Sequence, residues 1–280
     1  MTSAPPAAQA AQPVPAPVTA HANWNRIALV SDLHLGAHTP RTSQAFLDWL
    51  GGPARQAQAL FILGDLFEAW VGDDLLSAQA LTIAPDAARC AQRIAAALRH
   101  YTQSGGTLFV QHGNRDFLLG PAFAHATGAV LLPDPALLQF NGARILLTHG
   151  DQLCLGDSAY LIFRAQVRNP DWQRHTLAQP LAARLQQAQA LRAASAAAQE
   201  RSSLWADADP QEACRWMHAA SSRWMIHGHT HRPRDHWAGG LLRQVLADWD
   251  CDTPAPPRAQ ALWLQADGKA LCVHRATVTG

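Results

Sequence analysis

The residues Phe61-Ile-Leu-Gly-Asp-Leu-Phe-Glu-Ala-Trp-Val-Gly-Asp-Asp74 form the stretch that decides the fold. Its first residues are apolar and predict a buried strand, which breaks at Gly64 and leaves the carboxylate of Asp65 just beyond the strand end. Sheets of the α/β class place their functional groups at such ends. By itself Asp65 is also consistent with a helix N-cap, so its meaning depends on the other strand ends.

Four other short apolar segments end in polar residues in the same way. They are residues 27–30, 107–110, 143–147 and 223–226, followed by Ser31-Asp-Leu-His34, Gln111-His-Gly-Asn-Arg-Asp116, Thr148-His-Gly-Asp151 and His227-Gly-His-Thr-His231. Apolar residues at helical spacing predict helices over 42–50, 85–100 and 121–127 between these strands. The alternation of strands and helices predicts an α/β fold.

The chain divides into three parts by its sequence pattern. Residues 1–23 are rich in Ala and Pro, contain no Lys or Arg, and predict a disordered leader without a signal peptide. The strand pattern covers 24–154 and 221–280, whereas 155–220 contains leucines near helical spacing among arginines. We expect this insertion to form a helical cap over the strand ends, the alternative being an ordinary peripheral pair of helices.

Composition excludes several classes of protein. The net charge of +1 over 280 residues provides no general basic field, so we expect no nucleic-acid partner. The five cysteines are widely spaced and predict reduced thiols in a cytosolic protein. No segment approaches the ~20 apolar residues of a membrane span, so we expect any membrane contact to be peripheral.

The side chains after the strands are typical of a dimetal site. Carboxylate, amide and imidazole ligands without thiolate favour Mn²⁺, Fe²⁺, Zn²⁺ or Mg²⁺. Two such ions polarise phosphoryl oxygens and hold a hydroxide for attack, which predicts hydrolysis of a phosphoester or phosphoanhydride. The candidate ligands are Asp32, His34, Asp65, Asn114, His149, His227 and His229, with Asp65 as the bridge.

In this order, the motifs resemble those of the calcineurin-like metallophosphoesterases, whose pattern is D-x-H, G-D, G-N-H-[DE], H and G-H-x-H. The likeness covers approximately residues 27–250 and implies a sandwich of two sheets flanked by helices. Arg115 departs from the pattern, since it stands where the family usually has a histidine that helps to protonate the leaving group. An alternative role for Arg115 is a surface salt bridge with Asp116.

Three segments are similar to one branch of that family: residues 62–70, 112–120 and 226–233. The branch acts in lipid A biosynthesis of Gram-negative bacteria. The resemblance therefore implies cleavage of UDP-2,3-diacylglucosamine to UMP and 2,3-diacylglucosamine 1-phosphate (lipid X), through attack of a dimetal-bound hydroxide on the α-phosphorus. It also implies a cytoplasmic enzyme that lies peripherally on the inner-membrane surface; no protein partner is indicated.

The resemblance further implies residue roles. Two Mn²⁺ ions are expected per chain, with Mg²⁺ or another divalent ion as the alternative. One ion would be held by Asp32, His34, Asp65 and His229, and the other by Asp65, Asn114, His149 and His227. Catalysis would depend on Asp65, Asn114, Arg115 and His149. Substrate binding would involve Asn114, Arg115, Asp157, Tyr160, Phe163, Arg164, Arg192, Ser195 and His227.

Two other functions remain open on the sequence alone. One is a calcineurin-like hydrolase that acts on a different nucleotide-sugar or phosphodiester. The other is a non-catalytic scaffold that keeps this fold to bind proteins. The number of candidate ligands argues against the scaffold, because protein binding does not require them.

Overall fold

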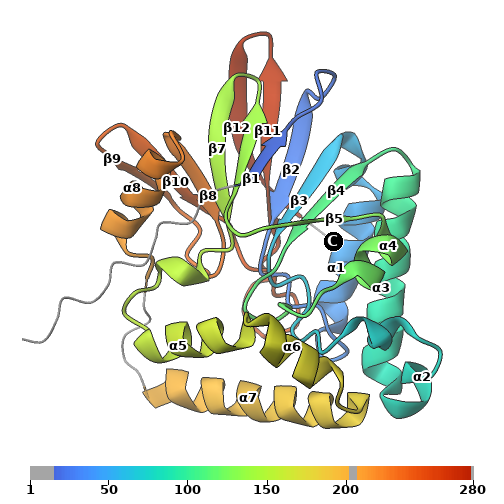
Figure 1. The fold of residues 1–280 in the computed structure, drawn as a ribbon. Helices are drawn as coiled ribbons and strands as arrows, with labels where there is room; N and C mark the ends of the chain where they lie inside the picture. Colours follow the sequence, from blue (N-terminus) through green and yellow to red (C-terminus); the bar gives the residue numbers. More distant parts are fainter. Residues whose placement is uncertain (1–15, 202–206, 279–280) are drawn as a thin grey trace, which may run out of the picture.

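The computed structural model describes residues 16–201 and 207–278, which contain two six-stranded sheets packed face to face (Figure 1). Sheet A has the order β1 (Ala16–Thr19), β6 (Ala136–Phe140), β7 (Ala143–Thr148), β8 (Trp224–His227), β10 (Leu241–Val245) and β9 (Asp235–Ala238). Sheet B has the order β12 (Ala270–Thr277), β11 (Gln260–Asp267), β2 (Arg26–Val30), β3 (Ala59–Leu63), β4 (Thr107–Gln111) and β5 (Val130–Leu132). Strands β2 to β5 are parallel neighbours, as expected for βαβ units.

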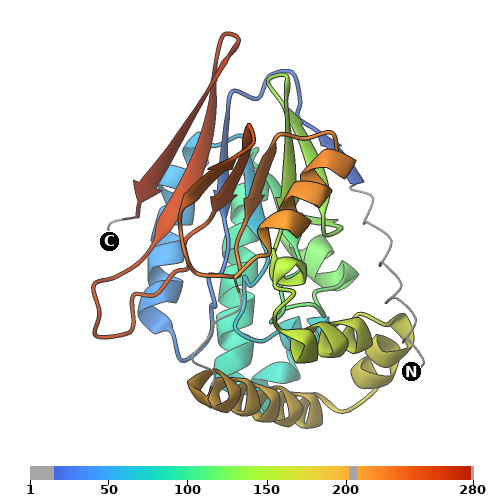
Figure 2. The ribbon, with the colours of Figure 1, turned by 90° about the vertical axis from the view of Figure 1, so that its left-hand side faces the viewer.

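Helices cover the outer faces of both sheets. On sheet B lie α1 (Pro40–Gly51), α2 (Ala80–Ile83), α3 (Pro85–Gln103) and α4 (Pro121–Thr127), and on sheet A lies α8 (Pro210–Ala219) (Figure 2). Helix α1 buries Phe46, Trp49 and Leu50, whose spacing places them on one face of a helix. Short 3₁₀ helices occur at η1 (Pro53–Gln56), η2 (Asp73–Leu76) and η3 (Asp151–Leu153). The predicted sandwich with flanking helices is confirmed.

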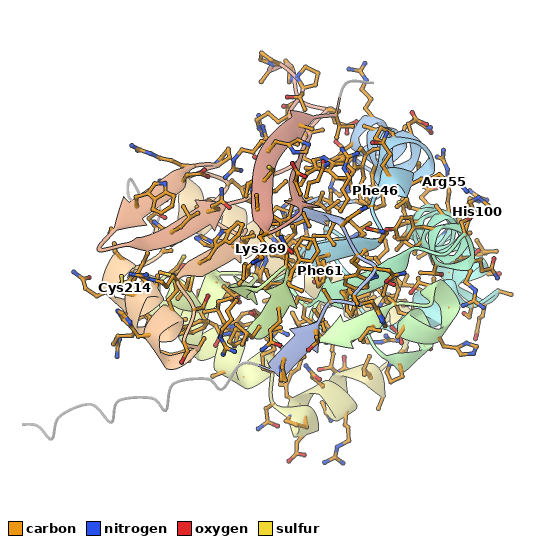
Figure 3. All side chains as sticks on the ribbon, turned by 90° about the horizontal axis from the view of Figure 1, so that it is seen from above. Phe46, Arg55, Phe61, His100, Cys214 and Lys269 are labelled. Carbon is orange, nitrogen blue, oxygen red and sulfur yellow. The ribbon has the colours of Figure 1, made fainter. Side chains whose placement is uncertain are left out.

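Strand β3 is buried on both faces, which explains its uninterrupted apolar sequence. Phe61 points between the sheets and stacks on Phe109 with ring centroids 4.6 Å apart, whereas Leu60 and Ile62 point into the core beneath the helices. Figure 3 shows Phe61 near the centre of the molecule and Phe46 on α1. Full burial of such an aromatic ring contributes about 2–3 kcal/mol, so this strand fixes the position of the loop that carries Asp65.

Three helices form a layer across one end of the sandwich: α5 (Ser158–Val167), α6 (Pro170–Leu177) and α7 (Leu181–Arg201) (Figures 1 and 2). They correspond to most of the expected cap. The expected boundary at 220 is wrong, because α8 packs on sheet A through Ala213, Trp216 and Met217. The apolar spacing of α8 gives no sign of whether it faces a sheet or a cap.

The leader differs from the expectation within its described part. Residues Ala16–Thr19 form β1, which pairs in parallel with β6, and Ala20 donates a hydrogen bond to the carbonyl of Gln139 at 3.0 Å. The short segment was expected to be disordered because it has little to bury, but its backbone groups are satisfied by the edge of sheet A. The expectation for residues 1–15 lies outside the described residues. Across the described parts of the chain, the helices are too short or too polar to span a bilayer.

Candidate metal centre and its cap

The predicted site residues lie in the loops that follow β2, β3, β4, β7 and β8. These loops meet at the end of the sandwich that the cap covers. Asp32, Asp65 and His149 come from three different strands, are buried, and have ligand atoms within 4.8 Å of one another. The convergence expected from the sequence is therefore present, and Asp65 is a central group rather than a helix cap.

A second group of ligand atoms surrounds the same Asp32. It contains Asp32, His34 and His231, also within 4.8 Å of one another. The Nε2 atoms of His34 and His231 face each other at 3.3 Å, and Nε2 of His231 lies 3.4 Å from Oδ1 of Asp32. Two imidazole nitrogens and a carboxylate oxygen thus point to one place.

Asn114 gathers two further histidines on the other side of Asp65. Its Oδ1 lies 3.0 Å from Nε2 of His149 and 3.0 Å from Nδ1 of His229. Nε2 of His149 is also 3.8 Å from Oδ2 of Asp65. An amide oxygen, a carboxylate and two imidazoles therefore form the second half of the site.

His227 is not part of either group, contrary to the expectation. Its Nδ1 lies 2.9 Å from the carbonyl oxygen of Gly228, and its Nε2 accepts from Nη1 of Arg243 at 2.9 Å. The structure brings His231 to the site instead. The pattern G-H-x-H could have found it, because it fits Gly228-His229-Thr230-His231 and does not fit a motif that begins at His227.

The backbone at the site is shaped by tight contacts. A Cβ atom on Gly113 would lie 2.0 Å from Oδ1 of Asp65, and one on Gly228 would lie 2.3 Å from Oδ2 of Asp32. Only glycine fits at these two positions. Five site residues have left-handed backbone conformations, with φ of 53° at Asp32, 48° at His34, 52° at Asp65, 65° at His229 and 53° at His231.

Burial and mutual attraction shift the pKa values of these groups in opposite directions. Burial raises the pKa of Asp65 to about 6, although His149 and His34 oppose the shift. Burial alone would lower the pKa of His149, but Asp65, Asp32 and Asp151 raise it to about 9. Burial lowers the pKa of His229 to about 4, with His149 adding to the effect. A proton on His149 therefore offsets the buried carboxylates, whereas His229 is held neutral.

The donor set fits two divalent cations. The facing nitrogens of His34 and His231 converge with a carboxylate oxygen of Asp32, so a cation between them would have three ligand atoms. Oxygen and imidazole ligands without thiolate suit Mn²⁺, Mg²⁺, Fe²⁺ or Zn²⁺. Six ligands of this set were expected from the sequence, including His229, and His231 takes the place of His227.

Arg115 lies beside this centre. Its backbone N–H donates to Oδ1 of Asp65 at 2.8 Å, and among the described residues its buried Nε has no hydrogen-bond partner. The alternative salt bridge with Asp116 is not formed. Asp116 is fully buried and accepts hydrogen bonds from the backbone of Gly113 and Leu66 at 2.7 and 2.8 Å. Arg115 therefore has donor capacity available for an anion.

Arginines attach the cap to the core at the segments that follow β3, β4 and β7. Arg164 on α5 donates to Asp151 at 2.8 Å, and Arg168 donates to the carbonyl of Gly113 at 2.8 Å. On α7, the buried Arg184 pairs with Asp74 and donates to the carbonyl of Val71, and Nε of Arg192 lies 2.8 Å from Oε1 of Glu68. Helices α5 and α7 therefore cover the metal centre, and the alternative of a peripheral pair is not supported.

The expected substrate-binding residues of the cap differ in what their side chains contact. Tyr160 and Arg164 both donate to Oδ2 of the fully buried Asp151, so these two side chains hold α5 to the core. Asp157 caps α5 by accepting from the N–H of Tyr160 at 2.9 Å. Phe163 is half-buried on the same helix. Ser195 falls on α7, but its side chain lies outside the described part of the chain.

Comparison with known proteins places this geometry in a wider group. A family model described as calcineurin-like phosphoesterase matches residues 25–233, a span that contains every candidate ligand. A UDP-2,3-diacylglucosamine hydrolase from Bordetella parapertussis is 44% identical over 247 residues, which cover 86% of this chain and 92% of that protein. A protein of the same name from Chromohalobacter salexigens is 41% identical over 251 residues, covering 85% and 98%. The crystal structure of a predicted phosphoesterase from Streptococcus pneumoniae is 13% identical, with a TM-score of 0.44 over 91% of this chain and 90% of that chain.

Proposed function

Because the chain belongs to the calcineurin-like phosphoesterase family, we propose that it hydrolyses the pyrophosphate bond of UDP-2,3-diacylglucosamine, giving UMP and 2,3-diacylglucosamine 1-phosphate. The proposal depends above all on the convergence of Asp32, Asp65 and His149 beneath a helical cap. Relatives of that name at 41–44% identity support the choice of substrate.

Two divalent ions, which we take to be Mn²⁺, would occupy the two groups of ligands. One group is Asp32, His34, Asp65 and His231, and the other is Asp65, Asn114, His149 and His229. Bound there, the ions would neutralise phosphoryl charge and lower the pKa of water so that it can attack. The water oxygen adds to the α-phosphorus, and the bond to the bridging oxygen breaks, so that this oxygen leaves on the lipid phosphate.

Arg115 would bind the pyrophosphate beside these ligands. Its Nε, which has no hydrogen-bond partner in residues 16–201 and 207–278, and its planar guanidinium suit the oxygens of a phosphate, and its backbone N–H is held by Asp65. A guanidinium remains protonated throughout, so Arg115 stabilises the charge that develops on the leaving oxygen without donating a proton. Arg192 on α7, which pairs with Glu68 in the free protein, would approach the same phosphates.

The cap would hold the lipid part of the substrate. An apolar chain pair needs an apolar chamber, while the pyrophosphate needs cations, and helices that bear both leucines and arginines above the metal centre provide the two together. We place Phe163 and other apolar cap residues against the acyl chains, and Asp157 and Ser195 near the polar head. Such a substrate lies in a membrane, so we propose peripheral binding at the cytoplasmic face of the inner membrane.

Purified protein supplied with Mn²⁺ and UDP-2,3-diacylglucosamine should release UMP, and Asp65→Ala should abolish the release. Unchanged activity in Asp65→Ala would contradict the assignment of the site. Equal kcat/KM for acylated and deacylated UDP-glucosamine would instead indicate a hydrolase of other nucleotide-sugars. Absence of bound metal after gentle purification, together with no hydrolysis of either compound, would favour a scaffold.

A further inference from the structure

Glu68 is a half-buried carboxylate that contacts one histidine and two arginines from three separate segments of the chain. It lies three residues after Asp65, and its side chain is 13% exposed. Its Oε2 lies 2.9 Å from Nδ1 of His34. Its Oε1 lies 2.8 Å from Nε of Arg192 and 3.9 Å from Nη1 of Arg115. The metal ligands, the phosphate-binding arginine and the cap therefore meet at one side chain.

The backbone holds Glu68 in place without help from these contacts. Its N–H donates to the carbonyl of Leu35 at 3.1 Å, and Leu35 in turn donates to the carbonyl of Leu66 at 3.0 Å. The neighbouring ring of Phe67 packs on Trp70 with centroids 4.6 Å apart. A carboxylate on so rigid a loop can determine where its partners lie, rather than follow them.

Each partner of Glu68 has freedom that the carboxylate restricts. The Nδ1 of His34 has no aligned hydrogen-bond partner among the described residues, although Glu68 is within contact distance, so the carboxylate is the group available to fix the ring once Nε2 is engaged. A carboxylate behind a metal-binding imidazole fixes its tautomer and strengthens it as a ligand. Arg192 is on a long side chain that is 38% exposed, and its guanidinium contacts Glu68 and His38.

Two arginines of α7, Arg184 and Arg192, hold that helix to the core at different points. Arg184, which lies eight residues before Arg192 on the helix, is buried and pairs with Asp74. Helix α7 therefore stays attached when Arg192 changes partner. The guanidiniums of Arg115 and Arg192 have the same charge and would repel each other beside a pair of divalent ions. The negative charge of Glu68 between them reduces this repulsion.

We propose that Glu68 is a positioning residue, which orients His34 as a metal ligand and holds Arg192 of the cap beside Arg115 for the pyrophosphate. This inference rests on the proposed function for the role of the arginines, but not for the role of His34. Glu68 touches neither the reacting phosphorus nor the ions in this scheme. An incoming phosphate takes over Arg192, so the cap helix changes its contact from a core carboxylate to the substrate.

The test compares Glu68→Gln, which keeps shape and removes charge, with Glu68→Asp, Arg192→Gln, and the double variant Glu68→Gln/Arg192→Gln. Asp86→Asn, an 81% exposed carboxylate on α3, is the matched control. Electron paramagnetic resonance measures Mn²⁺ affinity without substrate. Glu68→Gln should weaken it about 10- to 100-fold, as loss of such supporting groups does, whereas Glu68→Asp should restore part of it, and Arg192→Gln and the control should leave it unchanged.

Steady-state kinetics test the contact with the cap. Glu68→Gln and Arg192→Gln should each raise KM at saturating Mn²⁺, and the double variant should raise it no further than the worse single variant. Additive effects of the two substitutions would overturn the role toward Arg192, and unchanged Mn²⁺ affinity in Glu68→Gln would overturn the role toward His34.

If the unaltered protein does not hydrolyse the lipid substrate, the proposed function fails, yet the Mn²⁺ measurement still tests His34. Amide hydrogen exchange of α7 in Glu68→Gln then tests Arg192: faster exchange than in the control supports the contact, and equal exchange overturns it.

Discussion

Replacing Arg164 by methionine should destabilise the protein strongly, because it removes the cation that two buried carboxylates share. Nε of Arg164 lies 2.8 Å from Asp151, and Nη2 lies 3.8 Å from Asp134, whose side chains are 0% and 5% exposed. Opposite unit charges ~4 Å apart attract by about 4 kcal/mol at an effective dielectric constant of 20. Breaking a buried pair by removing one partner costs about 3–5 kcal/mol. Since Arg164 is itself 16% exposed, we take the lower end, about 3 kcal/mol.

Thermal unfolding in the presence of a chelator measures this loss without the contribution of bound metal. A loss of about 3 kcal/mol corresponds to a decrease in Tm of about 6–12 °C for a chain of this size. The effect should depend on pH. The neighbouring Arg164 and His149 outweigh burial and lower the pKa of Asp151, so the stabilisation is present above its ordinary pKa of 3.8 and is lost as the pH falls below that value.

A double-mutant cycle separates the ion pair from simple loss of packing. Asp151→Asn and Arg164→Met should each destabilise, and the combined variant should be more stable than the sum of the two losses by at least about 2 kcal/mol. Arg174→Met is the control, since Arg174 forms an exposed pair with Asp171 on α6 and should have little effect. Losses that add within about 0.5 kcal/mol would refute a coupled buried pair.

Three further outcomes are expected. Burial opposes but does not cancel the attraction of nearby carboxylates, and this attraction raises the pKa of His34 to about 8 and that of His149 to about 9, so Mn²⁺ must displace protons. Calorimetry in two buffers should detect the released protons, and the apparent Mn²⁺ affinity should rise up to about tenfold per pH unit for each proton between pH 7 and 8. A pH-independent affinity would contradict this. His231→Ala should lower the bound metal per chain whereas His227→Asn should retain it, and the reverse result in metal analysis would restore the ligand set expected from the sequence. Phe61→Ala should cost about 3–5 kcal/mol in urea unfolding, since the ring is fully buried between the sheets, and a loss below ~1 kcal/mol would argue against that packing.

The sequence predicts β2, β3 and β4 of sheet B well because local pattern and global position agree there. The strand at 59–63 is apolar throughout and ends in a glycine, and the structure has β3 at the same residues. Strand β6 was not expected, because Ala136–Phe140 carries no site residue, although its apolar residues lie between the turn-forming segments Pro133-Asp134-Pro135 and Asn141-Gly142. Strand β1 is short and poor in large side chains, and its pairing with β6 is a long-range contact that no local pattern contains.

The site shows a similar division between local and long-range information. Asp32, His34, Asp65, Asn114 and His149 follow strand ends, and their convergence follows from the topology of the sheets. Spacing alone does not separate His227 from His231, since both are two residues from His229, but the glycine that precedes His229 in the G-H-x-H pattern favours His231. In the structure His227 is kept from the site by Arg243, a residue of the neighbouring strand β10 that donates a hydrogen bond to the His227 ring.

The contacts of Tyr160 and Arg164 could not be predicted from the sequence. Their residue types suit substrate binding, and nothing in the sequence indicates that a buried Asp151 uses both. A cap that is fixed by such internal pairs leaves fewer of its polar groups for the ligand. Glu68 likewise has no strand-end signal of its own, because its importance arises from side chains that are distant in sequence.

The left-handed conformations at the metal centre have a consequence for how this protein has been selected. A residue with a side chain costs about 1 kcal/mol in that region, and glycine adopts it freely. Glycine at Asp32, His34, Asp65, His229 or His231 would therefore relieve the backbone, while it would remove a ligand. A lineage released from catalysis would gain by accepting such changes, and this chain has accepted none of the five. The backbone strain that these five residues retain therefore indicates that selection has kept their side chains as ligands.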